Sequence, residues 1–600
     1  MEKTEGQAQE TAVGRQREIV RRIAEKAFAL PLLDGGLWLY DDIRNNFYYA
    51  SYLFAASVDE TLPVTFDRQE AGQRALAVLR EVLLLQNTDP NTPLYGHWPL
   101  GLAPVPREAK PNELPVEIMG SLMAVFRSRY GGRLDGNTAA LLDAALGHVY
   151  RSGFFRKPLA HYHHHEAKYT AAKLIFGRLY ADAELMADGH ASLQALLAHM
   201  RQNGMAEYGI LPWFWHWVQA FTAALELAGD DGRADGCGCA ADLKAMLDKL
   251  WRIRAEVYLG GAWVGAHSRG WPHDVPRDGN VLHDYVQFGG FPLPDDMPRT
   301  EYAGLLHYPA PQDAVKTALD RSVPVEVKKR IVPISGQGPW HSYAYICEQF
   351  AAGGLWERVD EFDNEQLRWA FTLPVRADGS VNRLYFFHPG RGYREGDPRH
   401  QSGRMEVLYD RRVVAAWFKG PDESDSCDYA VGVLPEGSWL ERPNALFGRC
   451  DGALFAVFLS GGHILTERDG YREARLAALP GGVVVEAISE REAAARGIAD
   501  LAAFAAEMEG RAPKFAPAPQ AAQAGALAKP ADEEDAGSCK PAAATHAADQ
   551  PIGAAALSAP VIRYRSLQGG ELALALAEGA GGAAAAFLDG KPMIREGYTV

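Results

Sequence analysis

The sequence predicts an α+β protein with an N-terminal α/α toroid followed by a large antiparallel β-sandwich. The chain has 600 residues, more than one compact core usually holds. In the first 255 residues, two kinds of helical segment alternate along the chain. From about residue 325, short runs of alternating apolar and polar residues between Gly and Asp turns replace the helical pattern.

The helical segments differ in how much of their surface is apolar. Segments such as RQREIVRRIAEKAFAL and SLQALLAHMRQNG have one apolar stripe and one charged face. Segments such as DDIRNNFYYASYLFAAS and PWFWHWVQAFTAALELAG are apolar nearly all round, which is typical of helices buried on both sides. The alternation therefore predicts an outer and an inner ring of helices.

Each inner segment opens with a polar or aromatic cluster. These clusters are residues 41–46, 111–113, 161–166 and 208–216. Inner helices that run parallel to one another would bring all four clusters to the same rim. That shared rim is the strongest functional signal in the sequence.

The composition shifts along the chain define the expected domains. We expect a disordered N-terminus at 1–13, the toroid at 14–310 and the sandwich at 311–511. Residues 512–556 are rich in Ala and Pro and are expected to be a low-complexity insertion. Strand-like runs resume at 557–600, which predicts the C-terminal strands of the same sandwich.

Composition and charge narrow the function classes. A hydrophobic content of 47% and a charged content of 23% are typical of soluble globular proteins. The net charge of −15 and the absence of a basic stripe argue against a nucleic-acid partner. No secretory leader and no apolar run of about 18 residues is visible, so we expect no membrane segment. Six scattered cysteines suit reduced thiols and a cytoplasmic location.

The stretch HYHHHEAKYTAAK, residues 161–173, allows three interpretations. His161 and His165 have a usable metal-ligand spacing, although the H-E-x-x-H order is absent. The stretch is also compatible with a hydrated helix start. We favour a role for His164, His165 and Glu166 in substrate binding or proton transfer, because the other inner segments open similarly. No cofactor is expected, and a divalent metal remains the alternative.

The predicted architecture resembles that of the toroid polysaccharide lyases, which include the heparinase II/III-like, alginate, hyaluronate and chondroitin lyase groups. The resemblance is architectural and covers most of the chain. It implies an acidic saccharide bound between toroid and sandwich and cleaved by β-elimination, with Tyr and His as base and acid. It also implies that Asn, His or Arg neutralises the uronate carboxylate. Because no signal peptide is visible, oligosaccharide fragments are the expected substrate.

Two segments supply candidates for that chemistry. In LHDYVQFGG, Tyr285 is the expected lyase base or acid. In GAHSRGWPHD, His267 is expected to neutralise charge or move a proton, and Arg269 to bind a carboxylate through its guanidinium fork.

Two inner segments add further candidates. In WFWHW, His216 is a third catalytic candidate and Trp213 a sugar-binding one, although alternation by two puts some of these tryptophans in the core. In RNNFYYASY, Asn45 and Asn46 either bind the substrate carboxylate or cap the helix.

Two other function classes stay open. A glycoside hydrolase on the same scaffold would use paired carboxylates. The candidates are Asp41, Asp42, Glu113, Glu117 and Glu166. A non-catalytic carbohydrate-binding protein would keep the aromatic residues without needing the histidines. An acidic oligosaccharide is the expected partner, and the sequence carries no signal for an oligomeric state.

Overall fold

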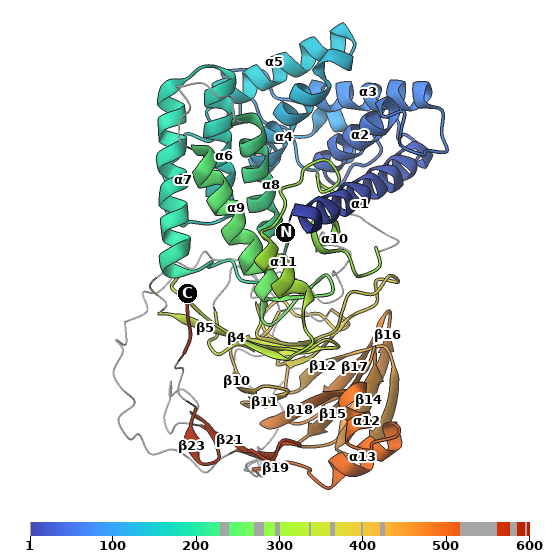
Figure 1. The fold of residues 1–600 in the computed structure, drawn as a ribbon, viewed down its shortest axis with the longest axis vertical. Helices are drawn as coiled ribbons and strands as arrows, with labels where there is room; N and C mark the ends of the chain where they lie inside the picture. Colours follow the sequence, from blue (N-terminus) through green and yellow to red (C-terminus); the bar gives the residue numbers. More distant parts are fainter. Residues whose placement is uncertain are drawn as a thin grey trace, which may run out of the picture.

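The structure of the protein is a computed structural model. It describes residues 2–209, 211–228, 239–268, 281–293, 300–334, 336, 338–359, 366–397, 400–420, 427–516, 561–576, 585–593 and 597–600. The helices of the first 320 residues lie in one half of the molecule, and the large sheets lie in the other, together with the short helices α12 (Glu490–Ala495) and α13 (Leu501–Glu509) (Figure 1).

The N-terminal half consists of helices in two layers. The helices are α1 (Glu2–Ala29), α2 (Ile43–Val58), α3 (Arg68–Leu84), α4 (Leu114–Tyr130), α5 (Gly136–Ser152), α6 (His164–Leu179), α7 (Ala183–Asn203), α8 (Leu211–Ala228) and α9 (Cys239–Glu256). In the inner layer, α2 packs against α4, and α4 packs against both α6 and α8. In the outer layer, α3 contacts α5 and α7 contacts α9. The inner helices are those that the sequence shows to be apolar nearly all round.

Two short helices close the ring. The helices α10 (Leu282–Phe288) and α11 (Gln312–Leu319) contact each other, and they link α1 to α9. The toroid predicted from the sequence is therefore confirmed. The first helix begins at Glu2, within the segment 1–13 that was expected to be disordered.

The C-terminal half consists of antiparallel sheets. An eight-stranded sheet has the order β16-β17-β12-β9-β8-β6-β5-β4, and a six-stranded sheet has the order β10-β11-β18-β15-β14-β13. Their strands are β4 (Val325–Ile331), β5 (Trp340–Ile346), β6 (Ala351–Leu355), β8 (Trp369–Thr372), β9 (Arg383–Phe387), β10 (Met405–Asp410), β11 (Val413–Phe418), β12 (Ala430–Pro435), β13 (Ser438–Arg442), β14 (Ala445–Cys450), β15 (Ala453–Leu459), β16 (His463–Arg468), β17 (Tyr471–Leu476) and β18 (Gly481–Ser489). One hydrophobic core includes residues of both sheets, which confirms the sandwich.

A third sheet is formed by the segments on either side of the Ala/Pro-rich stretch. Its strands are β19 (Lys514–Phe515), β20 (Ile562–Arg565), β21 (Glu571–Ala575), β22 (Ala585–Leu588) and β23 (Lys591–Pro592). Residues 557–600 were expected to extend the sandwich sheets, whereas the described strands among them form this separate sheet. It contacts the six-stranded sheet, because the Tyr564 hydroxyl donates to Glu486 Oε2 over 2.5 Å. The described chain also continues to residue 516, past the expected start of the insertion at 512.

The two halves meet along a seam of short strands and one small core. The strands β1 (Tyr258–Leu259) and β2 (Ala262–Trp263) pair with each other, and β3 (His267–Ser268) pairs with β7 (Gln366–Leu367). The Val332 N–H donates to the carbonyl of Asn203, at the end of α7, over 2.7 Å. Because α6 runs antiparallel to α7, the first turn of α6 lies at the end of the toroid nearest the sheets. The seam core consists of Tyr208, Ala266, Ile331, Trp340, Leu355 and Val359.

Candidate active site

The first turn of α6 is fixed by a carboxylate from the same helix. Glu166 accepts hydrogen bonds from the backbone N–H groups of Ala160, His161 and Tyr162 at 2.7, 3.0 and 2.6 Å. Tyr162 has a φ of 54°, a conformation that most side chains avoid. Glu166 therefore holds the loop before α6 in place. Its oxygens accept from the backbone here, and its role in binding substrate stays a prediction.

A buried ion pair lies one turn into α6. Glu117 of α4 accepts from Lys168 Nζ at 2.5 Å, and the Tyr169 hydroxyl donates to its other oxygen at 2.7 Å. His165 Nδ1 lies 2.6 Å from Glu117 Oε2. The side chains of Glu117 and Lys168 are each 3% exposed, whereas that of His165 is 28% exposed. His165 is therefore the member of this group that solvent or substrate can reach.

The charges around Glu117 decide its protonation. Burial alone raises the pKa of a carboxyl group, but Lys168 and His165 together bring the pKa of Glu117 well below its usual value. An ionised Glu117 accepts the Nδ1–H of His165. This fixes the tautomer and leaves Nε2 of His165 as the nitrogen that can exchange a proton.

A second imidazole–carboxylate pair lies beside the first. His164 Nδ1 is 2.5 Å from Glu207 Oε1, and the Trp217 indole N–H donates to Glu207 Oε2 at 2.7 Å. Burial lowers the pKa of His164 well below its usual value, so this ring is neutral. The ring of Trp213 stacks on His164 with centroids 4.4 Å apart and an interplanar angle of 20°.

A third pair connects α8 to the loop after α10. His216 Nε2 lies 3.9 Å from Glu301 Oε1, and the ring centroids of His216 and His164 are 5.7 Å apart. Glu301 is buried and has a φ of 35°. The neighbours of Glu301 are held on α2, because the Tyr52 hydroxyl donates to the Thr300 carbonyl and the Tyr302 hydroxyl donates to Ser51 Oγ. The loop is thus fixed on both sides of a strained residue.

The start of α2 adds a cation to the same region. Asp42 caps the helix by accepting from the Arg44 N–H, and the Arg44 guanidinium also contacts the Asp42 carboxylate at 2.6 Å. Arg44 interacts electrostatically with Glu301 and with Lys168, which places its guanidinium within range of the rim. One cluster therefore contains side chains from near the N-terminal ends of α2, α4, α6 and α8. This is the shared rim that the sequence predicts.

Asn45 and Asn46 have structural positions. Asn46 is fully buried, accepts from the N–H groups of Trp38 and Leu39, and donates to the Leu39 carbonyl. A side chain with these bonds fixes the loop before α2, which is the structural one of the two roles expected for Asn46. Asn45 lies in the first turn of α2, where its backbone N–H donates to the Asp42 carbonyl.

His267 lies in β3 and Tyr285 on α10, and each has contacts outside the group of rim imidazoles. His267 is 1% exposed, and its two ring nitrogens lie 3.1 and 3.0 Å from the carbonyls of Gly209 and Trp263. Burial brings the pKa of His267 well below its usual value, so it is a neutral interior residue and not a residue of an open cleft. Tyr285 lies on α10, where its ring contacts Phe291 edge-on at 5.8 Å. Arg269 falls outside the described residues.

Several residues of the cluster were not recognised from the sequence. Lys168, Tyr169, Glu207, Glu301 and Arg44 were not candidates, and Glu117 was one only for a hydrolase. A signal was present for Glu117 and Lys168, because each is a charged residue inside a segment that is otherwise apolar all round. Such residues are buried only when they are paired. Glu207 and Glu301 come from loops, and no periodicity points to them.

The imidazoles of the rim are paired with carboxylates. Among the described residues, no group of three or more His, Cys, Asp or Glu side chains is arranged to hold a metal ion. One ring nitrogen in each of His164, His165 and His216 lies within hydrogen-bond or ion-pair distance of a carboxylate oxygen. Likewise, no helix in the described ranges is both long and apolar enough to span a bilayer.

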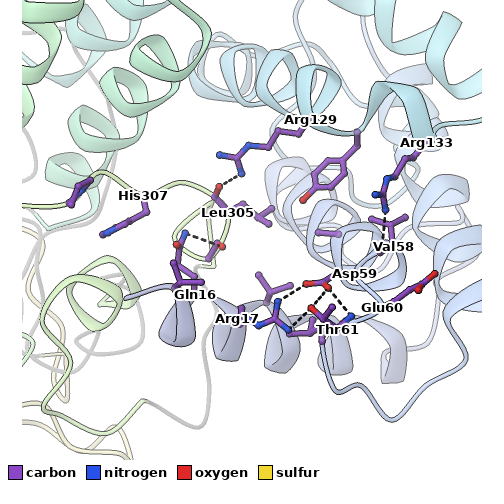
Figure 2. Close-up of a pocket in the computed structure, with 17 residues that line it drawn as sticks. Gln16, Arg17, Val58, Asp59, Glu60, Thr61, Arg129, Arg133, Leu305 and His307 are labelled. Atoms are coloured by element: carbon purple, nitrogen blue, oxygen red, sulfur yellow. Dashed lines mark hydrogen bonds and ion pairs between the residues drawn. The ribbon is translucent and has the colours of Figure 1, made fainter. Parts of the chain in front are cut away.

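A separate cleft of about 910 Å³ lies at the other end of α2 and α4 (Figure 2). Three arginines line it, and each is already engaged. Arg17 pairs with Asp59 at 2.8 Å, Arg129 pairs with Glu226, and Arg133 donates to the Val58 carbonyl at 2.8 Å. These arginines tie the ends of the helices together. The candidate acid–base groups are at the opposite end of the same helices.

Comparison with known proteins gives similarity in structure only. No protein-family model and no curated protein matches the sequence. The chondroitin AC lyase of Streptomyces coelicolor A3 in complex with chondroitin sulphate is similar, with 11% identity over 81% of each chain and a TM-score of 0.43. A tyrosine-to-alanine mutant of that enzyme has 11% identity, the same coverage and a TM-score of 0.40. A chondroitinase AC lyase studied with oligosaccharides has 10% identity, a TM-score of 0.44, and coverage of 98% of this chain and 93% of its own.

Proposed function

We propose that this protein is a lyase that cleaves uronate-containing oligosaccharides by β-elimination at the rim of the toroid. The observation that supports this most is the His165–Glu117 pair. Its carboxylate is ionised and buried, and its imidazole is the accessible partner, with Nε2 directed away from Glu117. A histidine whose Nδ1 is held by a carboxylate has its Nε2 positioned to take and return a proton.

The rim can supply each part of an elimination. His165 Nε2 takes the proton on the sugar carbon next to the carboxylate, and the carbon–oxygen bond to the leaving sugar breaks as a double bond forms. His216, beside Glu301, donates a proton to the leaving oxygen. The negative charge that develops on the carboxylate is stabilised by Arg44 and by the positive N-terminal ends of α4, α6 and α8. Trp213, stacked on His164, offers an aromatic face to the sugar ring.

The carboxylates of the rim favour elimination over hydrolysis. A glycoside hydrolase needs one carboxylic acid with a raised pKa and a second free carboxylate. Glu117 is held ionised by Lys168 and His165, Asp42 is bound by Arg44, and Glu166 is bound by three backbone N–H groups. Three of the five carboxylates expected for a hydrolase therefore serve to position other groups, whereas Asp41 and Glu113 are exposed.

The test is turnover of uronate-containing oligosaccharides, followed by the ultraviolet absorbance of the conjugated double bond that only elimination creates. We expect His165→Ala to reduce turnover by about 10²–10⁴-fold, or about 3–5 kcal/mol in the barrier. His161→Ala is the matched control, because His161 is exposed and lies before the helix. Products without the double bond would favour a hydrolase, and binding without turnover would favour a carbohydrate-binding protein. Either result would overturn the proposal.

A further inference from the structure

A small pocket lies on the seam between the toroid and the eight-stranded sheet. We call it the seam pocket, and its volume is about 70 Å³. Its walls are formed by Gly204, Met205, Tyr208, Lys249, Ile253, Glu256, Val257, Trp263, Ala266, Lys329, Arg330, Ile331, Ser342 and Val600. Most of these side chains are apolar, and the volume is enough for a few water-sized groups but not for a sugar ring.

The polar side chains around the seam pocket are mainly cations. Glu256 and the terminal carboxylate of Val600 are the acids among the lining residues, and both oxygens of Glu256 are bound by Lys329 Nζ at 3.0 and 2.8 Å. Lys249 and Arg330 have no ion pair within the described part of the chain. Burial and the nearby cations Lys329, Arg201 and Arg252 lower the pKa of Lys249. The three cations of the pocket wall, Lys249, Lys329 and Arg330, therefore outnumber its two acids, although the whole chain carries a net charge of −15.

The walls of the seam pocket continue directly into the rim. Met205 and Tyr208 line the pocket, and Glu207 lies between them. Glu207 is the carboxylate that holds His164 Nδ1 at 2.5 Å and binds the indole of Trp217. On the other side of the segment, the Gly209 carbonyl is bound by His267. A group that fills the pocket therefore contacts the same short segment that orients a rim histidine.

We propose that the seam pocket binds a short-chain carboxylate, with its charged end on Lys249 and its apolar end against Met205 and Ile253. Binding there orders residues 204–209 and so the Glu207–His164 pair. The effect on turnover rests on the proposed function of the rim. The binding itself does not.

Binding is tested by titrating the protein with sodium formate, acetate and propionate at constant ionic strength, with chloride as the replaced anion. The intrinsic fluorescence of the protein, to which Trp263 in the pocket wall contributes, reports saturation. We expect affinity to rise about fourfold for each added CH₂, because each is buried against apolar walls. The absence of saturation, or equal affinity for all three anions, would overturn the proposal.

Substitutions of Lys249 test whether the carboxylate binds in the seam pocket. Lys249→Met keeps an apolar stem and should weaken acetate binding about tenfold, because one charge-assisted hydrogen bond is lost. Lys249→Arg should retain most of the binding. Lys110→Met removes an exposed lysine elsewhere and should leave binding unchanged. Equal binding by Lys249→Met and the unaltered protein would overturn the assignment.

A separate measurement tests the coupling. Acetate should change the turnover of the unaltered protein but not that of Lys249→Met. If acetate binds at Lys249 without any effect on measurable turnover, the coupling through Glu207 is wrong and the site stands. If no elimination is detected with any uronide, the proposed function fails. The titrations still show whether the seam pocket binds a carboxylate, because they do not depend on turnover.

Discussion

The carboxylate of Glu117 lies 2.5 Å from the ammonium group of Lys168, and both side chains are almost completely buried. The pair connects two inner helices, α4 and α6, one turn below the rim. Its geometry explains how the toroid tolerates charges in helices that are otherwise apolar all round. It also makes the rim depend on a buried charge balance, because the carboxylate that pairs with Lys168 also orients His165.

Removing the charge of Glu117 should destabilise the toroid. In Glu117→Gln, the buried ammonium of Lys168 loses its counter-charge, and we expect a loss of about 3–5 kcal/mol in the free energy of unfolding. Urea denaturation measures this loss. The double variant Glu117→Gln/Lys168→Met removes both charges and should recover most of it. A single variant as stable as the unaltered protein would contradict the ion pair as described.

The backbone strain at Glu301 leads to a comparison of two truncations. Glu301→Ala and Glu301→Gly both remove the carboxylate next to His216, so both should lose turnover. At a φ of 35° the alanine variant keeps the strain and the glycine variant relieves it. We expect the glycine variant to be more stable by about 1 kcal/mol, measured by denaturation. A glycine variant that is less stable than the alanine variant would show that the backbone there is unstrained.

The contact between the third sheet and the sandwich should depend on pH. Burial raises the pKa of Glu486 from 4.5 to about 7, although hydrogen bonds from Tyr564 and the Leu567 N–H act in the other direction. A raised carboxyl pKa means that the folded state binds the proton more tightly. The stability that Glu486 contributes is then fully present below about pH 4.5 and lost as the pH rises through about 7.

Glu486→Gln isolates this effect, because the amide does not titrate. Urea denaturation of both proteins from pH 4.5 to 8 should show the unaltered protein losing on the order of 3 kcal/mol relative to the variant as the pH rises. Other titrating groups are common to both proteins and cancel in the difference. A difference that stays constant over this range would mean that Glu486 has an ordinary pKa.

His267 should contribute to stability and not to chemistry. Its ring is buried at the seam between two backbone carbonyls, so His267→Ala should lower the free energy of unfolding by about 2 kcal/mol or more. Turnover per folded molecule should remain within a few-fold of the original. A hundredfold loss of turnover at unchanged stability would restore the catalytic role that the sequence suggested.

A chain cut between residues 517 and 560 should stay assembled. Strand β19 lies before this stretch and β20 after it, and the two pair with each other. The Thr599 carbonyl also accepts from the Arg330 N–H at 2.8 Å, which joins the last residues to β4. A protease site inserted in the stretch should give two fragments that elute together under native conditions and separate in urea. Separation under native conditions would contradict these pairings.

The sequence by itself determined the two-domain architecture and the rim. Helical periodicity shows which helices are buried all round, and period-two runs show where the sheets begin, because burial on one or two faces leaves a repeating pattern in the chain. The positions of His164, His165, His216 and Trp213 at one rim also follow, since these residues open inner helices. A buried charge in an apolar helix was a further local signal, present at Glu117 and Lys168.

Only the tertiary structure decided which of these side chains remain available. Glu166 and Asn46 have the right chemistry and position, but backbone groups from neighbouring loops occupy them. His267 is in a glycine-rich segment that looks exposed in the sequence, yet β3 pairs with β7 and buries it. Glu207 and Glu301 complete the rim from loops far along the chain. A hydrogen-bond partner distant in sequence leaves no periodic pattern, so folding alone brings these carboxylates to their histidines.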